Sequence, residues 1–152
     1  MQVHGKIKTG FAANIKDEKR LLLNLVSKLS KIDDGVIVTW RGKRFDLPFL
    51  LTRSLFHGID ASPILRMQHV DLAEFAARNF KFSKVSQERM CQFMGIRKKK
   101  DLQGYQMPTR YVKFLSGDSS EKKRILEHCV DDVRSLSLIY EKLRPYVEAA
   151  IS

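Results

Sequence analysis

The sequence predicts an α/β fold. Short runs rich in β-branched residues alternate with longer segments whose apolar residues recur at helical spacing. Hydrophobic residues make up 43% of the chain, which supports a buried core and argues against disorder. A length of 152 residues fits one compact domain, so residues 1–152 are expected to form a single domain.

The first part of the chain predicts two strands around one helix. Residues 3–11 have weak strand character and are expected to form one edge strand. Residues 17–32 predict an amphipathic helix, because apolar and charged residues keep helical spacing there. Residues 36–40 are short, β-branched and almost continuously apolar. This pattern is typical of a strand buried on both faces of a parallel sheet.

The rest of the chain predicts one more strand and several helices. In order, we expect a helix at 47–57, a strand at 67–72 that runs into a helix ending at 80, a helix at 85–94, a basic loop at 97–106 and a short helix at 108–115. The last helix is predicted to begin at a segment that resembles a capping box and to end near residue 143; that segment is Asp118-Ser119-Ser120-Glu121.

The last predicted helix carries a carboxylate on its apolar face. At about 100° per residue, Asp132 falls within the apolar stripe, whereas Asp131 points to the opposite side. His128 lies one turn before Asp132, so the two side chains can act at one place. An ordinary buried Asp–His hydrogen bond and a functional site are both consistent with this pattern.

A second carboxylate follows the predicted strand at 36–40. Asp46 lies just beyond the carboxyl end of this strand, where open α/β sheets place their ligands. Asp46 also precedes a predicted helix with Pro48 in its first turn, so the simpler interpretation is a helix cap.

The charge of the chain favours a polyanionic partner. Lysine and arginine total 28 against 17 acidic residues, giving a net charge of +11. Such a surplus attracts nucleic acid, because bound cations release counterions from phosphates. Solubility, a ribosomal role and a membrane-surface role are alternative explanations of the charge.

Two segments together resemble the motifs of a known enzyme family. The first is Gly42-Lys43-Arg44-Phe45-Asp46-Leu47-Pro48-Phe49-Leu50, which resembles the second motif of the DEDD-type, DnaQ-like 3′–5′ exonucleases, Asn-Gly-x-x-Phe-Asp-x-Pro-Phe-Leu. The other is His128-Cys129-Val130-Asp131-Asp132-Val133, which resembles their third motif. A histidine four residues before the aspartate is similar to the YprB-type ribonuclease-H-like branch, related to the exonuclease domain of family-B DNA polymerases.

The resemblance implies a ribonuclease-H-like three-layer fold with a mixed sheet and a two-metal site. Asp46 and Asp132 would be ligands of Mg²⁺ or Mn²⁺, and His128 would orient or deprotonate the attacking water. Phosphate contacts would come from basic side chains of two segments: Arg41, Lys43, Arg44, Arg97, Lys98, Lys99 and Lys100. Phe45 and Phe49 would be core residues.

The chain departs from the family pattern at two points. The family's first motif, Asp-x-Glu on the opening strand, is absent, because residues 1–14 contain no acidic residue. The resemblance therefore describes an N-terminally truncated fold, and the metal site would be incomplete. In addition, Arg41 stands where the family usually has asparagine. Its guanidinium would either contact phosphate or fill space near an absent metal.

The missing strand would leave an apolar edge beside residues 36–40. We therefore expect a homodimer through this edge or a partner chain that supplies the missing strands and carboxylates, with rearrangement of residues 3–11 into the gap as a third option. Two functions stay open: a 3′–5′ exonuclease completed by a partner, and an inactive nucleic-acid-binding or accessory subunit. A basic binding module without nuclease ancestry is a weaker alternative.

The remaining features predict the setting of the protein. Its two cysteines imply no disulfide framework, which favours a reducing, intracellular and cytoplasmic location. No stretch is long and apolar enough to cross a bilayer. DNA and RNA are not distinguished by any motif.

Overall fold

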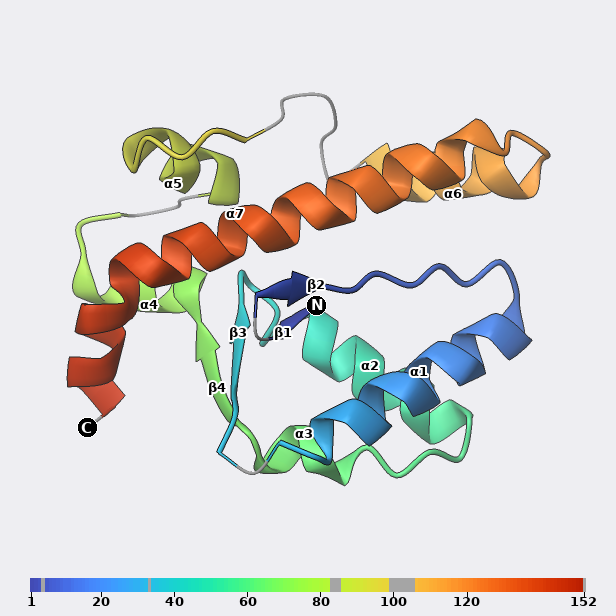
Figure 1. Ribbon diagram of the computed structural model, residues 1–152, viewed down its shortest axis with the longest axis horizontal. Helices are drawn as coiled ribbons and strands as arrows, with labels where there is room; N and C mark the ends of the chain where they lie inside the picture. The colour runs from blue at the N-terminus through green and yellow to red at the C-terminus, as the bar shows by residue number, and fades with distance from the viewer. Residues whose placement is uncertain (4, 33, 83–85, 99–105, 152) are drawn as a thin grey trace. The chain divides into compact units, whose positions relative to one another are not determined.

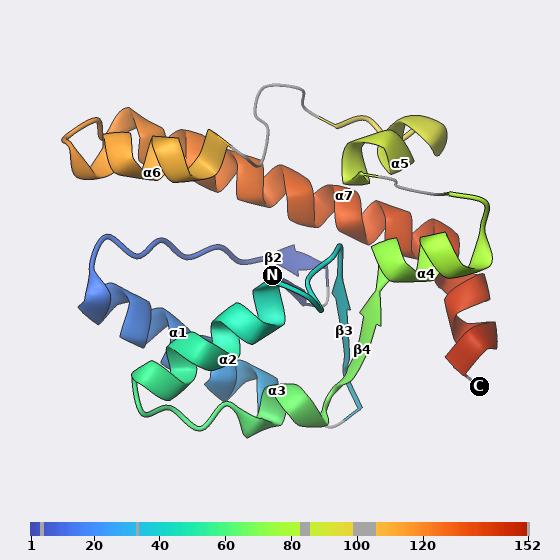
Figure 2. The same cartoon turned by 180° about the vertical axis from the view of Figure 1, so that it is seen from behind.

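A computed structural model describes residues 1–3, 5–32, 34–82, 86–98 and 106–151. The described residues form two compact units. Unit 1 comprises residues 1–13 and 87–152, and unit 2 comprises residues 14–86. Figures 1 and 2 show the elements of each unit from opposite sides. The predicted α/β class is confirmed, since both helices and small sheets are present.

Unit 2 is built around a parallel strand pair. Its elements are α1 (Ile15–Leu29), β3 (Val36–Thr39), α2 (Asp46–Phe56), α3 (Ser62–Arg66), β4 (Gln68–Asp71) and α4 (Leu72–Asn79). β3 and β4 are aligned in parallel from the pair Val36 and Gln68 to the pair Thr39 and Asp71. The predicted parallel strands are therefore confirmed, while α3 was not predicted.

The prediction that residues 36–40 are buried on both faces was wrong. Val36 is exposed, and the following residues of β3 are only half-buried. Among the described residues, β3 pairs with β4 alone, so its other edge has no neighbouring strand. Burial on both faces requires such neighbours, which a local sequence pattern does not report.

A small core fixes α1 and α3 beside the strand pair. Val26, Ala61 and Ile64 are buried together, and five partly buried side chains pack against them: Leu29, Ile37, Leu47, Leu51 and Ile59. α1 begins at Asn14, whose side chain accepts a hydrogen bond from the backbone N–H of Asp17. The amphipathic helix predicted at 17–32 is thus confirmed, and its apolar face is directed to this core.

Two predictions about α2 were wrong. Its N-cap is Phe45 and no side chain caps the helix, so Asp46 is the first helical residue instead of the cap. Phe45 and Phe49 do not belong to the core: they are 70% and 53% exposed. The helix buries the side that carries Leu47, Leu51 and Ser54, which leaves the two rings on the other side.

An ion cluster joins α1 to the end of α2. The Glu18 carboxylate accepts hydrogen bonds from Nε of Arg53 at 2.7 Å and from its second nitrogen at 2.5 Å. Nε2 of His57 lies 3.0 Å from the same carboxylate. These contacts, led by the Arg53 hydrogen bond, lower the pKa of Glu18 to about 2. Glu18 is therefore held in its ionised form between the two helices.

Unit 1 is organised along a long C-terminal helix. Its elements are β1 (Gln2–Val3), β2 (Lys6–Ile7), α5 (Gln87–Phe93), α6 (Met107–Leu115) and α7 (Ser120–Ile151). α5, α6 and the β1–β2 pair all contact α7 (Figure 1). The helices predicted at 85–94 and 108–115 are confirmed within their described residues. The single edge strand at 3–11 was wrong, because a turn at Gly5 folds the segment into a two-stranded antiparallel pair.

The start of α7 was predicted correctly, but its end was not. Oδ1 of Asp118 accepts hydrogen bonds from the backbone N–H and hydroxyl of Ser120 and so caps the first turn. The helix continues past residue 143, with Pro145 inside it. Leu143 and Val147 are both buried on the same side of the helix, and this burial offsets the hydrogen bond that Pro145 removes.

The remaining fold predictions have mixed outcomes. Both cysteines are free, as expected, although Cys129 is exposed on a face that was predicted to be apolar and buried. Within the part of the chain that the structure describes, no helix has the length and apolar character needed to span a bilayer. The three-layer arrangement, the truncation and the single domain stay predictions.

Candidate functional site

In unit 2, Asp71 organises the loop between β3 and α2. Its carboxylate is buried and accepts hydrogen bonds from the backbone N–H groups of Arg41 at 2.9 Å and Lys43 at 3.1 Å. It also accepts from the N–H groups of Ala73 and Glu74 at the start of α4. Burial alone would raise the pKa of Asp71, but these four donors outweigh it and hold the pKa below its usual value. Asp71 therefore serves as a fixed anionic anchor for the loop.

Asp46 lies against this loop at the carboxyl edge of the strand pair. A Cβ atom added at Gly42 would lie 2.9 Å from Oδ2 of Asp46 and 2.6 Å from Cβ of Thr39. Only glycine leaves room for the loop to run this close to the carboxylate. Partial burial, and then the charge of Asp71, raise the pKa of Asp46. A raised pKa is characteristic of a carboxylate that a cation would stabilise.

The backbone conformation at position 41 suits asparagine better than the arginine that stands there. Arg41 has a φ of 60°, in the left-handed region, where asparagine is favoured over most other side chains. The asparagine usual in the family at this position would therefore suit the loop conformation. The Arg41 side chain is exposed.

Two further basic residues of the loop meet at one acid. Nζ of Lys43 lies 3.6 Å from the Glu74 carboxylate, and Nε of Arg44 lies 3.2 Å from it. Both basic side chains are largely exposed, at 61% and 85%. The predicted phosphate-contacting residues of this loop thus form an accessible cationic surface that Glu74 partly neutralises.

In unit 1, Asp132 belongs to a separate cluster. Nζ of Lys98 lies 2.6 Å from Oδ1 of Asp132, and Nε2 of His128 lies 3.1 Å from Oδ2. Gln87 donates a hydrogen bond to the backbone carbonyl of Asp132. The Lys98 side chain is only 14% exposed, so its ammonium is a close and partly desolvated partner of the carboxylate. Lys98 therefore places a positive charge directly beside the Asp132 carboxylate.

The predicted site residues are thus distributed over two local clusters. One cluster lies in unit 2, in and beside the loop between β3 and α2, and contains Arg41, Lys43, Arg44 and Asp46. The other lies in unit 1, where Lys98 and His128 contact Asp132. The convergence of Asp46 with Asp132 stays a prediction. Arg97 is exposed, and Lys99 and Lys100 lie outside the described residues.

Neither cluster alone fits a two-metal site. Across the described ranges, no three or more His, Cys, Asp or Glu side chains are grouped so that they could hold a metal ion. Asp71 is saturated by backbone N–H groups, and Asp132 is paired with an ammonium. Of Asp46, Asp71 and Asp132, Asp46 is the most exposed residue.

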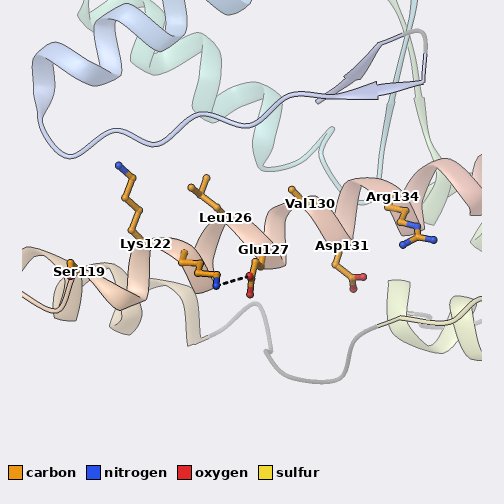
Figure 3. Close-up of a pocket in the computed structure, with 8 residues that line it drawn as sticks. Ser119, Lys122, Leu126, Glu127, Val130, Asp131 and Arg134 are labelled. Carbon is orange, nitrogen blue, oxygen red and sulfur yellow. Dashed lines mark ion pairs between the residues drawn. The ribbon is translucent and has the colours of Figure 1, made fainter.

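A hollow along α7 is not the predicted site. It encloses about 490 Å³, and Figure 3 shows its lining residues: Ser119, Lys122, Lys123, Leu126, Glu127, Val130, Asp131 and Arg134. Asp131 therefore lines the hollow, whereas Asp132 contacts Lys98 and His128. The side chains of Asp131 and Asp132 therefore lie in different surroundings, as the helical spacing predicted.

A family model for the RNase H superfamily matches residues 2–144. The chain belongs to the ribonuclease H superfamily. This ribonuclease-H-like chain is 32% identical to the uncharacterized protein YprB of Bacillus subtilis over 118 residues, which cover 75% of the chain and 29% of YprB. It is 23% identical to a protein named DNA polymerase 2 of Aeropyrum pernix, over 88% of the chain and 18% of that protein.

These relatives support the kinship with DEDD-type exonucleases that the motifs predicted, and they indicate a nuclease-like domain. The ribonuclease-H-like chain spans less than a third of the length of either relative. A search of solved structures finds no significant match.

Sequence reasoning missed one residue of the clusters, Asp71, and one pairing, that of Lys98 with Asp132. Asp71 is the last residue of β4 and stands three residues before Glu74, a spacing typical of a helix N-terminus, so its capping role was detectable. The Lys98–Asp132 pair joins residues far apart in the chain, and no local pattern predicts it.

Proposed function

We propose that this chain is the nuclease-like part of a nucleic-acid-processing protein that binds DNA or RNA. The observation that carries the proposal is the position of Asp46. In a chain of the ribonuclease H superfamily, this exposed carboxylate with a raised pKa lies at the carboxyl edge of a parallel strand pair. It adjoins exposed cations suited to phosphate, and the net charge of +11 favours the same class of ligand.

Phosphodiester hydrolysis from 3′ ends would require a complete two-metal site. Bound Mg²⁺ or Mn²⁺ would activate water and stabilise charge on the phosphate. In this proposal Asp46 and Asp132 contribute ligands, His128 holds the attacking water, and a second subunit or a partner chain contributes the Asp-x-Glu carboxylates. In the part of the chain that the structure describes, the second edge of β3 pairs with no strand and Val36 is 37% exposed, which supports the association.

A second candidate is a catalytically inactive subunit that binds nucleic acid or accompanies a nuclease or polymerase. The Lys98–Asp132 ion pair at 2.6 Å favours this candidate. An ammonium in contact with the carboxylate competes with a metal ion for the same oxygen and repels it electrostatically.

A nuclease assay separates the two candidates. Purified chain is incubated with 3′-labelled single-stranded DNA and RNA in Mg²⁺ or Mn²⁺, alone and with candidate partner chains bearing Asp-x-Glu. Cleavage that is lost in both Asp46→Asn and Asp132→Asn, but kept in the neighbouring control Asp131→Asn, supports the completed enzyme. Binding without cleavage under every condition supports the inactive subunit.

The association is tested independently by size-exclusion chromatography with light scattering. A homodimer that dissociates on Val36→Lys supports pairing through the β3 edge, because an edge lysine disfavours strand addition. A clean monomer at all concentrations contradicts the homodimer.

A further inference from the structure

Three polar side chains of the strand pair form a hydrogen-bonded chain next to the loop that precedes Asp46. Thr39 pairs with Asp71 across the parallel strands, and His69 lies two residues before Asp71 on β4. Because side chains alternate between the faces of a strand, these three residues share one face. Nε2 of His69 lies 2.8 Å from Oγ1 of Thr39, and the Thr39 hydroxyl donates to Oδ2 of Asp71 at 3.3 Å.

The hydrogen bonds of this chain run in one direction. A threonine hydroxyl has a single hydrogen, which here is donated to Asp71, so its oxygen accepts from His69. Burial lowers the pKa of His69, so its ring is neutral near neutral pH and carries one N–H. That hydrogen must therefore lie on Nε2. The geometry thus specifies one of the two neutral forms of the ring.

Thr39 connects this chain to the loop. The Thr39 hydroxyl and the backbone N–H of Lys43 both donate to Oδ2 of Asp71. The methyl group of Thr39 faces the loop as well, because a Cβ atom added at Gly42 would lie 2.7 Å from it. The two hydrogen bonds of the hydroxyl fix the rotamer of Thr39 and thereby the position of this methyl group.

The loop in turn determines where α2 begins. The backbone N–H of Leu47 donates to the carbonyl of Gly42 at 2.9 Å. This hydrogen bond ties the loop to the first turn of α2, where Asp46 is the first residue. A displacement of Thr39 would therefore reach Asp46 through Gly42.

We propose that His69 is a positioning residue for Asp46. Its Nε2–H holds the Thr39 hydroxyl towards Asp71, and the Asp71 carboxylate holds the loop. Without a donor at position 69, the Thr39 oxygen loses its hydrogen-bond partner and the side chain can rotate away from Asp71. The proposal rests on the proposed function in one respect, that Asp46 is a carboxylate of the site. His69 itself contacts no ligand in this proposal.

Amide hydrogen exchange of the full chain, followed residue by residue by NMR, tests the proposal without any ligand. His69→Met and Thr39→Val remove the hydrogen bonds but keep side chains of similar size, whereas His69→Gln keeps a donor. One hydrogen bond contributes roughly 2- to 12-fold to a local opening equilibrium. We expect His69→Met to accelerate exchange at Lys43 and Leu47 by about this factor, and His69→Gln to retain the wild-type rates. The amide of Val26 in α1 reports on global opening of unit 2 and should keep its rate.

A double variant distinguishes one connected chain from two separate contributions to stability. Thr39→Val should have the effect of His69→Met, and the two substitutions together should add nothing further, because both break the same chain. Additive effects overturn the proposal. So does equal acceleration at Val26, since His69 would then support only the fold, and so do unchanged rates at Lys43 and Leu47.

The wild-type protein provides a second measurement that needs no variant. A proton–nitrogen correlation spectrum of the imidazole should show the His69 hydrogen on Nε2, and a hydrogen on Nδ1 overturns the proposal. None of these measurements uses nucleic acid. Their failure is therefore distinguishable from failure of the proposed function, which the nuclease assay reports through Asp46→Asn.

Discussion

Neutralising Glu18 is expected to loosen the attachment of α1 to α2. Glu18→Gln keeps the shape of the side chain but removes the charge that binds Arg53 and His57. The pKa of Glu18 is about 2, against an ordinary value of 4.5. This difference corresponds to about 3 kcal/mol before solvent screening. Because the carboxylate is 23% exposed, we expect a loss of about 1–2 kcal/mol in the free energy of unfolding.

The pH dependence gives the prediction its sign. The pKa of Glu18 is lower in the folded chain than in the unfolded chain, so its stabilisation is fully present above pH 4.5. The stabilisation is lost as the pH falls from about 4.5 towards about 2. The difference between wild type and Glu18→Gln should therefore be largest near neutral pH and shrink progressively through this window.

Urea unfolding followed by the fluorescence of Trp40 measures this effect in unit 2. Trp40 is the single tryptophan of the chain and directly follows β3. Glu141→Gln, an exposed substitution on α7, controls for the loss of one negative charge. A difference that is constant between pH 7 and pH 3, or one no larger than that of the control, would refute the reasoning.

Four further predictions concern the two clusters. Arg41→Asn should raise the free energy of unfolding by up to about 1 kcal/mol, because asparagine tolerates the left-handed backbone conformation at this position better than arginine does. Gly42→Ala should lower the free energy of unfolding by about 1–3 kcal/mol, because the added methyl group would clash with Thr39. Urea unfolding that finds the opposite order contradicts the loop geometry. Glu74→Gln should release Lys43 and Arg44 and tighten oligonucleotide binding about 2- to 5-fold at low salt. This gain in affinity should fade as the salt concentration rises. An unchanged affinity in anisotropy titrations counts against phosphate contacts by these two side chains. Lys98→Met should leave the Asp132 carboxylate free to bind a cation, so Mn²⁺ should raise the melting temperature of this variant. Mn²⁺ should not raise the melting temperature of the control Lys98→Met/Asp132→Asn. Equal Mn²⁺ responses of the two variants would show that the Lys98 ammonium does not occupy a cation site.

The exposure of the Phe45 and Phe49 rings and the pairing of Lys98 with Asp132 both depend on segments distant in the chain. The motif around Asp46 suggested core phenylalanines, because apolar residues are usually buried. Their exposure depends on which elements cover α2, and no neighbouring residue in the sequence encodes that. Likewise, Asp132 was recognised as a carboxylate on an apolar helix face, but the ammonium beside it comes from residue 98.

The sequence by itself determined the local elements and the kinship. Periodic apolar residues set α1 and α7, β-branched residues set the parallel strand β3, and two short motifs identified the superfamily that residues 2–144 match. These features depend on residues a few positions apart, whose spacing fixes which side chains share a face. Only the tertiary structure decided that β3 is half-buried, that Asp71 anchors the loop beside Asp46, and that Phe45 and Phe49 are accessible. Burial and ion pairing arise between segments distant in the chain, so they follow from packing and not from local pattern.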